Sequence, residues 1–309
     1  MEQNDPTPLH KSVLQGASKQ RILSIGGTGL VGSRISELLS SKYQITNFGS
    51  SDINITNPDS VKLLPLQDFD TIILFSAKTD VDGCEKDKEL KEQGSAWKIN
   101  VLGAQNIAEA CFENSKKLIY ISTDSIFDGT IQHGHGYTED NAPNPQNWYG
   151  YTKWQGEKIV QSSGCEYLII RLAFPYRARF DKKKDFMRTI KEKLENRQEV
   201  KAVTDQFFCP TFIDDLANVF DVLIQNNAEG IYHAVGGGTL TPHNAALQIA
   251  DVFGLEKSLI YPTTREEFFK NRAMRPYNLT LKNDKIEFLG VRMKTFEEGL
   301  KEIKNQLNI

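Results

Sequence analysis

Short apolar runs alternate with longer amphipathic stretches through the first half of the chain. Five runs dominated by apolar residues predict strands buried on both faces of a sheet; they span 21–25, 44–48, 71–75, 117–122 and 167–171. The amphipathic stretches predict helices at 31–41, 95–114 and 149–162. Strands that alternate with helices of this length are typical of βαβ units, so we predict a parallel sheet with helices on both faces.

The pattern changes after residue 171. A basic stretch at 176–198 leads to a segment at 204–220, and a short predicted strand at 230–235 precedes a helical tail rich in Lys and Glu. The sequence has neither a repeat of fixed period nor a low-complexity linker between two independent domains. We therefore predict an α/β fold in which a Rossmann-type doubly wound parallel sheet carries a smaller C-terminal substrate-binding lobe.

The composition is that of an ordinary globular protein, with 39% hydrophobic and 25% charged residues among 309. The net charge of −3 gives no general attraction to nucleic acid or anionic lipid, and no apolar run approaches the roughly 20 residues that span a bilayer. The first 20 residues lack the features of a signal or transit peptide, so we expect a cytoplasmic protein without a membrane or nucleic-acid partner. Four scattered cysteines, with no CxxC pair, are expected to be reduced and buried.

A glycine-rich segment, GGTGLVG at 26–32, lies directly after the first predicted strand and opens the next helix. Gly26 allows a tight turn, Gly29 lets the backbone approach a pyrophosphate, and Gly32 permits close packing of helix on strand. The helix N-terminus adds free N–H groups and a partial positive charge for the phosphates. The segment predicts a dinucleotide site, with a glycine turn that serves no ligand as the alternative.

The domain boundaries follow from this site and from the change of pattern. We predict that residues 1–19 form a flexible N-terminal tail. Residues 20–172 then form the NAD(P)-binding domain, to which residues 212–235 return. Residues 173–211 and 236–309 form the substrate-binding lobe.

A tyrosine and a lysine four residues apart are the candidate proton-transfer pair. Positions i and i+4 share one face of a helix, so the Tyr149 hydroxyl and the Lys153 ammonium converge. A free phenol has a pKa of about 10, and a nearby ammonium lowers that pKa toward the range of a general acid/base. The same spacing also occurs on exposed helix faces, but its position after the glycine turn favours catalysis.

A third motif, ISTDSIFDG at 121–129, runs off the end of the fourth predicted strand. Ligands of doubly wound sheets bind at the carboxyl ends of the strands. A hydroxyl there, from Ser122 or Thr123, would reach both a substrate oxygen and the Tyr149 hydroxyl. The alternative is a Ser/Thr/Asp turn that only caps the strand.

Taken in order, these motifs resemble the extended short-chain dehydrogenase/reductase family, in its dTDP-4-dehydrorhamnose reductase branch. The resemblance covers nearly everything after residue 20. Its markers lie at 26–32, 52–61, 76–85, 100–111, 121–129, 137–157, 205–211 and 275–276.

The resemblance implies roles for individual residues. Thr123 is the catalytic hydroxyl, Tyr149 the acid, and Lys153 its activator and the anchor of the cofactor ribose. Phe174 and Arg275 are expected on the substrate side. The cofactor neighbours besides Tyr149 and Lys153 are expected to be Gly26, Thr28, Gly29, Leu30, Val31, Gly32, Asp52, Ile53, Ser76, Ala77, Lys78 and Asn100.

The chain also departs from the family pattern near the nicotinamide and sugar pockets. Ser76 and Lys78 stand where many relatives have an alanine and an aromatic residue. After Arg171 the sequence reads LAFPYR instead of a turn of small residues. These departures leave the identity of the sugar open.

The end of the second predicted strand bears on the choice of cofactor. It reads NFGSS at 47–51, with no carboxylate to bind a ribose 2′-hydroxyl before Asp52. Ser50 and Ser51 offer donors to a 2′-phosphate, although no arginine stands beside them. We therefore favour NADP(H), with NAD(H) as the alternative.

Other polar clusters have simpler interpretations. Lys182, Lys183 and Lys184 predict a solvated basic face. His133 and His135 form an HxH in a glycine-rich loop without further ligands, so we predict a loop and no metal site. His233 falls in a predicted strand and is expected in the core.

The leading functional hypothesis is reduction of a keto group on a nucleotide-activated deoxysugar, with hydride from the nicotinamide and a proton from Tyr149. In a second hypothesis the protein has the same fold but catalyses epimerisation or dehydration of a sugar nucleotide. A third is a non-catalytic, dinucleotide-binding regulatory subunit. The resemblance further implies a homodimer formed through the helices at 95–114 and 149–162.

Overall fold

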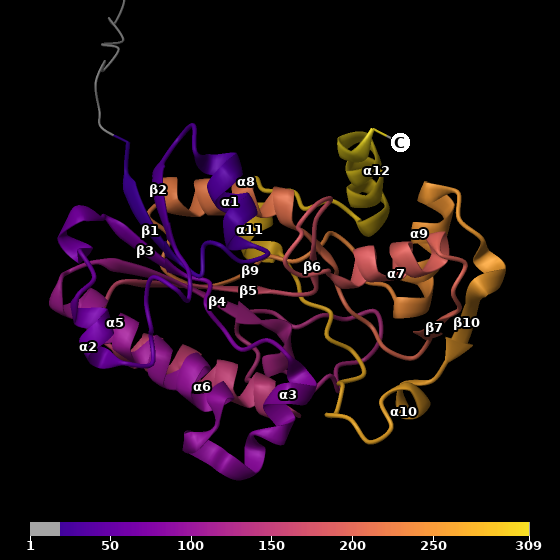
Figure 1. Ribbon diagram of the computed structural model, residues 1–309, viewed down its shortest axis with the longest axis horizontal. Helices are drawn as coiled ribbons and strands as arrows, with labels where there is room; N and C mark the ends of the chain where they lie inside the picture. The colour runs from indigo at the N-terminus through magenta and orange to yellow at the C-terminus, as the bar shows by residue number, and fades with distance from the viewer. Residues whose placement is uncertain (1–18, 309) are drawn as a thin grey trace, which may run out of the picture.

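The structure is a computed structural model that describes residues 19–308, and its centre is one sheet of six parallel strands (Figure 1). The strand order is β2-β1-β3-β4-β5-β9, which confirms the predicted doubly wound sheet. The strands from the five apolar runs differ from their predicted ends by at most one residue. The bounds are β1 (Arg21–Ile25), β2 (Gln44–Phe48), β3 (Thr71–Leu74), β4 (Lys117–Thr123), β5 (Tyr167–Leu172) and β9 (Gly230–His233).

Helices cover both faces of the sheet (Figure 1). Neighbouring residues of a strand point to opposite faces, so Ile119 joins one apolar core and Leu118 the other. The Ile119 side carries α1 (Gly32–Leu39), α8 (Ile213–Gln225) and α11 (Asp284–Phe288). The Leu118 side carries α2 (Pro58–Lys62), α5 (Gly103–Glu113) and α6 (Trp148–Ser162).

The helix predicted at 95–114 is interrupted by a π-helical turn. It consists of α4 (Ser95–Trp97), the π turn η3 (Lys98–Leu102) and α5. The turn contains Asn100, whose amide oxygen accepts from the Lys78 backbone N–H at 2.8 Å and whose amide group donates to Thr152 Oγ1 at 3.0 Å. One buried side chain thus joins the loop after β3 to α6, which fits the frequent occurrence of π turns at functional sites.

The second lobe is built on its own aromatic core. The Tyr176 ring packs there against Phe212 and Phe296, with centroid distances of 5.7 and 5.0 Å. Its helices and strands are α7 (Phe186–Glu195), α9 (Pro242–Phe253), α10 (Arg265–Phe268), α12 (Phe296–Leu307), β6 (Pro175–Tyr176), β7 (Val200–Val203), β8 (Thr211–Phe212) and β10 (Ile260–Thr263).

The predicted domain boundaries stay a prediction, but one C-terminal segment packs on the main sheet. Residues 236–309 were expected in the second lobe, but Ile286 and Met293 lie in the core that covers the main sheet. The segment 284–293 therefore returns to the first domain, as α8 and β9 also do. Of the predicted N-terminal tail, residues 1–18 lie outside the described residues.

A buried ion pair fixes α6 against the sheet. Both carboxylate oxygens of Glu157 accept from the Arg171 guanidinium, at 2.9 and 2.7 Å, and both side chains are almost fully buried. The ring of His233 lies 3.3 Å from the same guanidinium, and burial lowers the pKa of His233 to about 3, so this core histidine is neutral. Because Tyr149 and Lys153 belong to α6, the pair holds the helix on which they stand.

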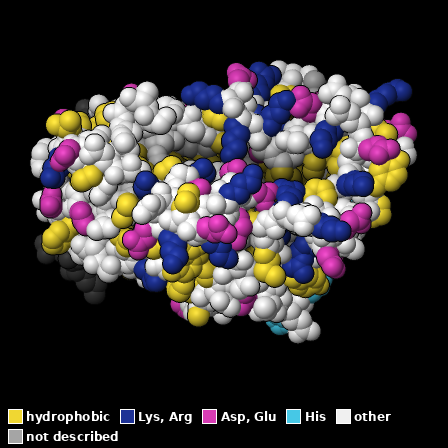
Figure 2. All heavy atoms as spheres, turned by 60° about the horizontal axis from the view of Figure 1, so that its bottom comes forward, with side chains coloured by type: hydrophobic (Ala, Val, Ile, Leu, Met, Phe, Trp, Pro, Cys, Tyr) yellow, Lys and Arg dark blue, Asp and Glu magenta, His cyan; other side chains and the backbone are white. Residues whose placement is uncertain are grey.

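Two further expectations concern the whole described chain. The four cysteines are free and buried, as predicted. Within residues 19–308, no helix is long and apolar enough to cross a membrane. On the face shown in Figure 2, basic side chains are mixed with acidic ones instead of forming one continuous basic surface.

Candidate active site

A cavity of about 510 Å³ lies where β1, β3 and β4 end, between the sheet and the second lobe. Parallel strands bring their carboxyl ends to one edge, which is why motifs far apart in the sequence meet here. Ten predicted site residues line it: Gly26, Gly29, Leu30, Val31, Gly32, Ala77, Thr123, Tyr149, Lys153 and Phe174.

The glycine turn leaves room for a ligand to approach the backbone. Gly26 has a φ of +81°, and a Cβ there would lie 2.6 Å from the Ser76 backbone nitrogen. A Cβ on Gly32 would lie 2.8 Å from the Gly27 Cα, so the helix could not start so close to the strand. No side chain caps α1; the Ser33 and Arg34 N–H groups bond the Gly29 and Val31 backbone oxygens, whereas the N–H groups at 30–32 have no partner in the described structure and can face an anion. The turn fits a pyrophosphate.

The Lys153 ammonium is buried beside the cavity, with 2% of the residue exposed. It donates to the Ile121 backbone oxygen at 2.7 Å and to the Tyr120 hydroxyl at 2.8 Å. Burial lowers the pKa of Lys153 to about 7, while the nearby Glu157 carboxylate acts to raise it. The charge state of Lys153 is therefore sensitive to its few hydrogen bonds.

The Tyr149 hydroxyl and the hydroxyl of Thr123 meet at the same end of the cavity. Burial raises the pKa of Tyr149, and a hydrogen bond with the Thr123 side chain acts in the opposite direction. This differs from the simple expectation that Lys153 lowers the phenol pKa, because the ammonium is directed to Ile121 and Tyr120. In this structure Tyr149 is a neutral phenol, which is the form that donates a proton.

Asp124 is the strongest candidate that the sequence motifs did not single out. Its Oδ1 accepts from the Thr123 and Ser125 hydroxyls at 3.0 and 3.1 Å, while its buried Oδ2 has no partner. Burial raises the pKa of this carboxyl to about 6. An acidic residue directly after the strand-end hydroxyl was the available signal for it.

Several predicted cofactor residues lie outside the cavity lining. Thr28 lies against Gly49, at the end of β2, and Asp52 accepts from the Gly49 backbone N–H at 2.7 Å. Ile53 is buried in the core. Ser76 packs against Gly26 of the glycine turn.

Three more predicted residues support neighbouring segments. The Lys78 ammonium donates to Ser95 Oγ at 2.9 Å, and Asn100 holds the Lys78 backbone. Arg275, expected on the substrate side, is paired with Asp82 of α3 (Val81–Lys86) at 3.0 Å. Some predicted site residues therefore line the cavity, whereas others bond the segments around it.

The second lobe contributes residues that the sequence patterns did not assign to the site. Lys183 and Lys184 are exposed, as the predicted solvated face requires, and they also line the rim of the cavity; Lys183 Nζ lies 3.3 Å from Thr79 Oγ1. Arg177 donates to the Leu30 backbone oxygen at 3.2 Å. These contacts join the two lobes across the cavity, and only the folded chain shows which cations reach it.

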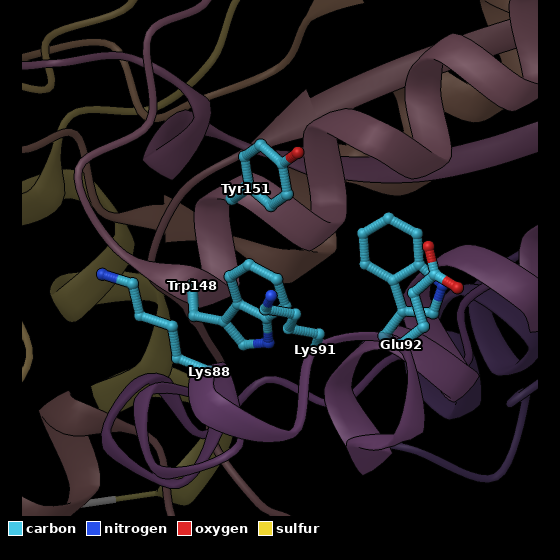
Figure 3. A pocket seen from close by; sticks show the side chains of 6 residues that line it. Lys88, Lys91, Glu92, Trp148 and Tyr151 are labelled. Atoms are coloured by element: carbon cyan, nitrogen blue, oxygen red, sulfur yellow. The ribbon is translucent and has the colours of Figure 1, made fainter.

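A shallower hollow lies on the other side of α6. Figure 3 shows Trp148 and Tyr151 facing it, together with Lys88, Lys91 and Glu92. The rings of Trp148 and Tyr151 stack with their centroids 5.1 Å apart. Tyr149, which lies between these residues in the sequence, lines the cofactor-sized cavity instead.

The chain matches one family model along nearly all of the described residues. The model is described as the RmlD substrate binding domain, and it matches residues 20–309. The chain belongs to this family. The extended dehydrogenase/reductase resemblance seen in the motifs is thereby confirmed.

Three similar proteins illustrate the range of the family. The crystal structure of dTDP-4-dehydrorhamnose reductase from Bacillus anthracis str. Ames in complex with NADP is 30% identical, with a TM-score of 0.84, and the match covers 94% of this chain and all of that one. The spore coat polysaccharide biosynthesis protein SpsK of Bacillus subtilis (strain 168) is 28% identical over 91% of this chain and 96% of its own. The methionine adenosyltransferase 2 subunit beta of Xenopus tropicalis is 30% identical over 92% and 86%.

We expect Gly26→Ala to weaken NADPH binding at least about tenfold, because the added Cβ meets the Ser76 backbone and the turn needs a positive φ. Gly230→Ala is the matched control: Gly230 has a φ of +85°, but a Cβ there meets nothing within 4 Å. Titration of each variant with NADPH, followed by cofactor fluorescence, measures both. Equal affinity in the two variants would contradict the placement of the pyrophosphate at this turn.

Proposed function

We propose that this chain is an NADP(H)-dependent reductase of a nucleotide-activated keto-deoxysugar. The observation that carries the proposal is the convergence of Thr123, Tyr149 and Lys153 on one cavity beside the glycine turn. The family relationship supports it, since a member 30% identical is a dTDP-4-dehydrorhamnose reductase with NADP bound.

The residues present fit the cofactor. Gly26 and Gly29 line the cavity without side chains, the backbone N–H groups at 30–32 have no partner in the described structure, and the buried Ser122 Oγ that lines the cavity has none either. When bound, the nicotinamide supplies the hydride. Lys153 would anchor the ribose.

The protein's own part is to hold the substrate carbonyl and to protonate it. Tyr149 places its hydroxyl where negative charge develops on the carbonyl oxygen, and a donor fixed at such a point is most effective. The Thr123 hydroxyl donates to Asp124 in this structure and would turn its proton to the carbonyl oxygen when substrate binds. Tyr149 then transfers its proton to that oxygen. The unpartnered Oδ2 of Asp124 would accept a hydrogen bond from a sugar hydroxyl.

Tyr149→Phe should leave NADPH binding unchanged and lower turnover on the order of 10²-fold or more, because the variant keeps the ring but has no proton to give. NADPH consumption with a dTDP-4-keto-6-deoxysugar measures turnover. Tyr261→Phe, at an exposed tyrosine of the second lobe, is the control and should behave as wild type. Undiminished turnover in Tyr149→Phe would remove Tyr149 as the acid.

The two alternative functions make different predictions in the same assay. An epimerase or dehydratase would convert the nucleotide sugar without net consumption of NADPH. A regulatory subunit would bind NADPH but reduce no keto sugar; one similar protein is by name a subunit, the methionine adenosyltransferase 2 subunit beta. The intact Thr123, Tyr149 and Lys153 favour the reductase.

The cofactor preference is proposed to depend on the loop after β2. Asp52 bonds its own loop at Gly49, so the exposed Ser50 and Ser51 remain for a 2′-phosphate. Ser51→Asp should weaken NADPH binding by about tenfold through charge repulsion and change NADH binding much less. Ser51→Asn has nearly the same shape without the charge and should retain the NADPH preference. The dissociation constants of both cofactors test this, and an equal change for NADPH and NADH would exclude a phosphate contact at Ser51.

We also propose that the chain forms a homodimer through the outer faces of α5 and α6. Phe112 on α5 and Leu102, the last residue of the π turn before it, are 57% and 37% exposed. At the start of α6, Trp148 and Tyr151 line a hollow (Figure 3). Exposed apolar side chains gathered on one face are typical of an interaction surface.

Sedimentation equilibrium should therefore give a dimer for the wild type. Phe112→Glu should give a monomer, because two buried carboxylates would face each other across the interface. Phe288→Glu is the matched control, since Phe288 is 91% exposed on α11, and it should remain dimeric. A wild-type monomer at micromolar concentration would refute the proposed dimer.

A further inference from the structure

The Lys153 ammonium is held by only two groups in the described structure. An ammonium has three N–H donors. One is directed to the Ile121 backbone oxygen and one to the Tyr120 hydroxyl, which leaves the third for the cavity that Lys153 lines. The direction of that third donor therefore depends on Tyr120 and Ile121.

Tyr120 reaches Lys153 from β4. Its side chain lies on the α5 and α6 side of the sheet and is 1% exposed. Lys153 Nζ lies 2.8 Å from the hydroxyl and 4.0 Å from the ring centroid, so both the oxygen and the π face stabilise the positive charge. Tyr120 thus stabilises the Lys153 ammonium through two contacts, one from its hydroxyl and one from its ring.

The hydroxyl of Tyr120 also has a defined proton. Burial raises the pKa of Tyr120 well above its usual value, so the phenol stays neutral. Its hydrogen points to the Asn100 backbone oxygen at 3.5 Å, and its lone pairs face Lys153. The result is a buried chain of hydrogen bonds from Lys153 through Tyr120 to the π turn at Asn100.

Gly156 makes this arrangement possible. A Cβ at this position would lie 2.3 Å from the Tyr120 hydroxyl and 2.5 Å from the Asn100 backbone oxygen. No other residue type would let α6 pass so close to the two groups. The local sequence of α6 is thus adapted to the Tyr120 hydroxyl as well as to Lys153.

We propose that Tyr120 is a positioning residue: its phenol oxygen holds the Lys153 ammonium, ties it to the Asn100 backbone, and directs the remaining N–H into the cavity. Its kinetic consequence rests on the proposed reductase function. The effect of Tyr120 on the Lys153 ammonium does not depend on that function.

The charges around Lys153 give the sign of the effect. Burial lowers the pKa of Lys153. The Tyr120 oxygen, 2.8 Å away, should oppose this because it accepts a stronger hydrogen bond from the ammonium than from the neutral amine. Removing that oxygen should lower the pKa further. The other titratable and charged groups facing this region are Tyr149 and Glu157 on α6, Asp124 after β4, Arg171 on β5, His233 on β9 and Cys84 on α3.

The test is Tyr120→Phe, which keeps the ring and removes the acceptor. A hydrogen bond to a charged group changes a pKa by about one unit, so the pKa of Lys153 should fall by about one pH unit. NMR of protein labelled with ¹³C-lysine measures that pKa directly, and Lys153→Ala identifies the signal. The alkaline limb of kcat/KM for NADPH should move to lower pH by the same amount, because the charged form is lost as pH rises through the pKa.

Tyr176→Phe is the matched control, since the Tyr176 hydroxyl is equally buried but has no partner. It should change neither the Lys153 signal nor the pH profile, and thermal unfolding of both variants shows that they fold. An unchanged Lys153 pKa in Tyr120→Phe would overturn the proposal. If the pKa shifts but no keto sugar is reduced even by wild type, the positioning role stands and the proposed function fails.

Discussion

The rest of the site depends on one constraint, which is that the positive charge of Lys153 must be kept inside the protein. An isolated buried ammonium is very unfavourable, so it survives only where other groups compensate it. Here the compensation comes from a backbone oxygen and a phenol on β4, and from the Glu157 carboxylate one turn further along α6. Those groups can reach Lys153 only while α6 lies directly on the sheet.

The packing of α6 then determines where the acid lies. Glu157 is itself held by Arg171 of β5, and Thr152 by Asn100 in the π turn. The same helix presents Tyr149 to Thr123 at the end of β4. The second lobe adds the opposite wall of the cavity, and Arg177 joins that wall to the glycine turn. The cavity thus lies where α6, the carboxyl end of β4 and the second lobe meet.

Much of this could be predicted from the sequence because it depends on local patterns. Apolar runs located the strands to within one or two residues. The glycine turn and the YxxxK pair could be found because each is defined by the spacing of a few neighbouring residues. The partners of Lys153 could not be found in this way: Tyr120 looks like one more apolar residue of a buried strand. Arg275 was expected on the substrate side, and only tertiary packing shows its ion pair with Asp82. The contact of the exposed Lys183 with Thr79 across the cavity is likewise a tertiary contact. The return of residues 284–293 to the main sheet is likewise a long-range contact that no periodicity marks.

The central claim is that hydride passes from NADPH to a carbonyl carbon of a nucleotide sugar while Tyr149 protonates its oxygen. The most direct test uses NADPH deuterated at the transferable position of the nicotinamide, with a dTDP-4-keto-6-deoxysugar as substrate. The account predicts that NADPH is consumed in equal amount to the sugar, and that the product alcohol carries deuterium on the former carbonyl carbon. A converted sugar without deuterium and with the cofactor unchanged would contradict it.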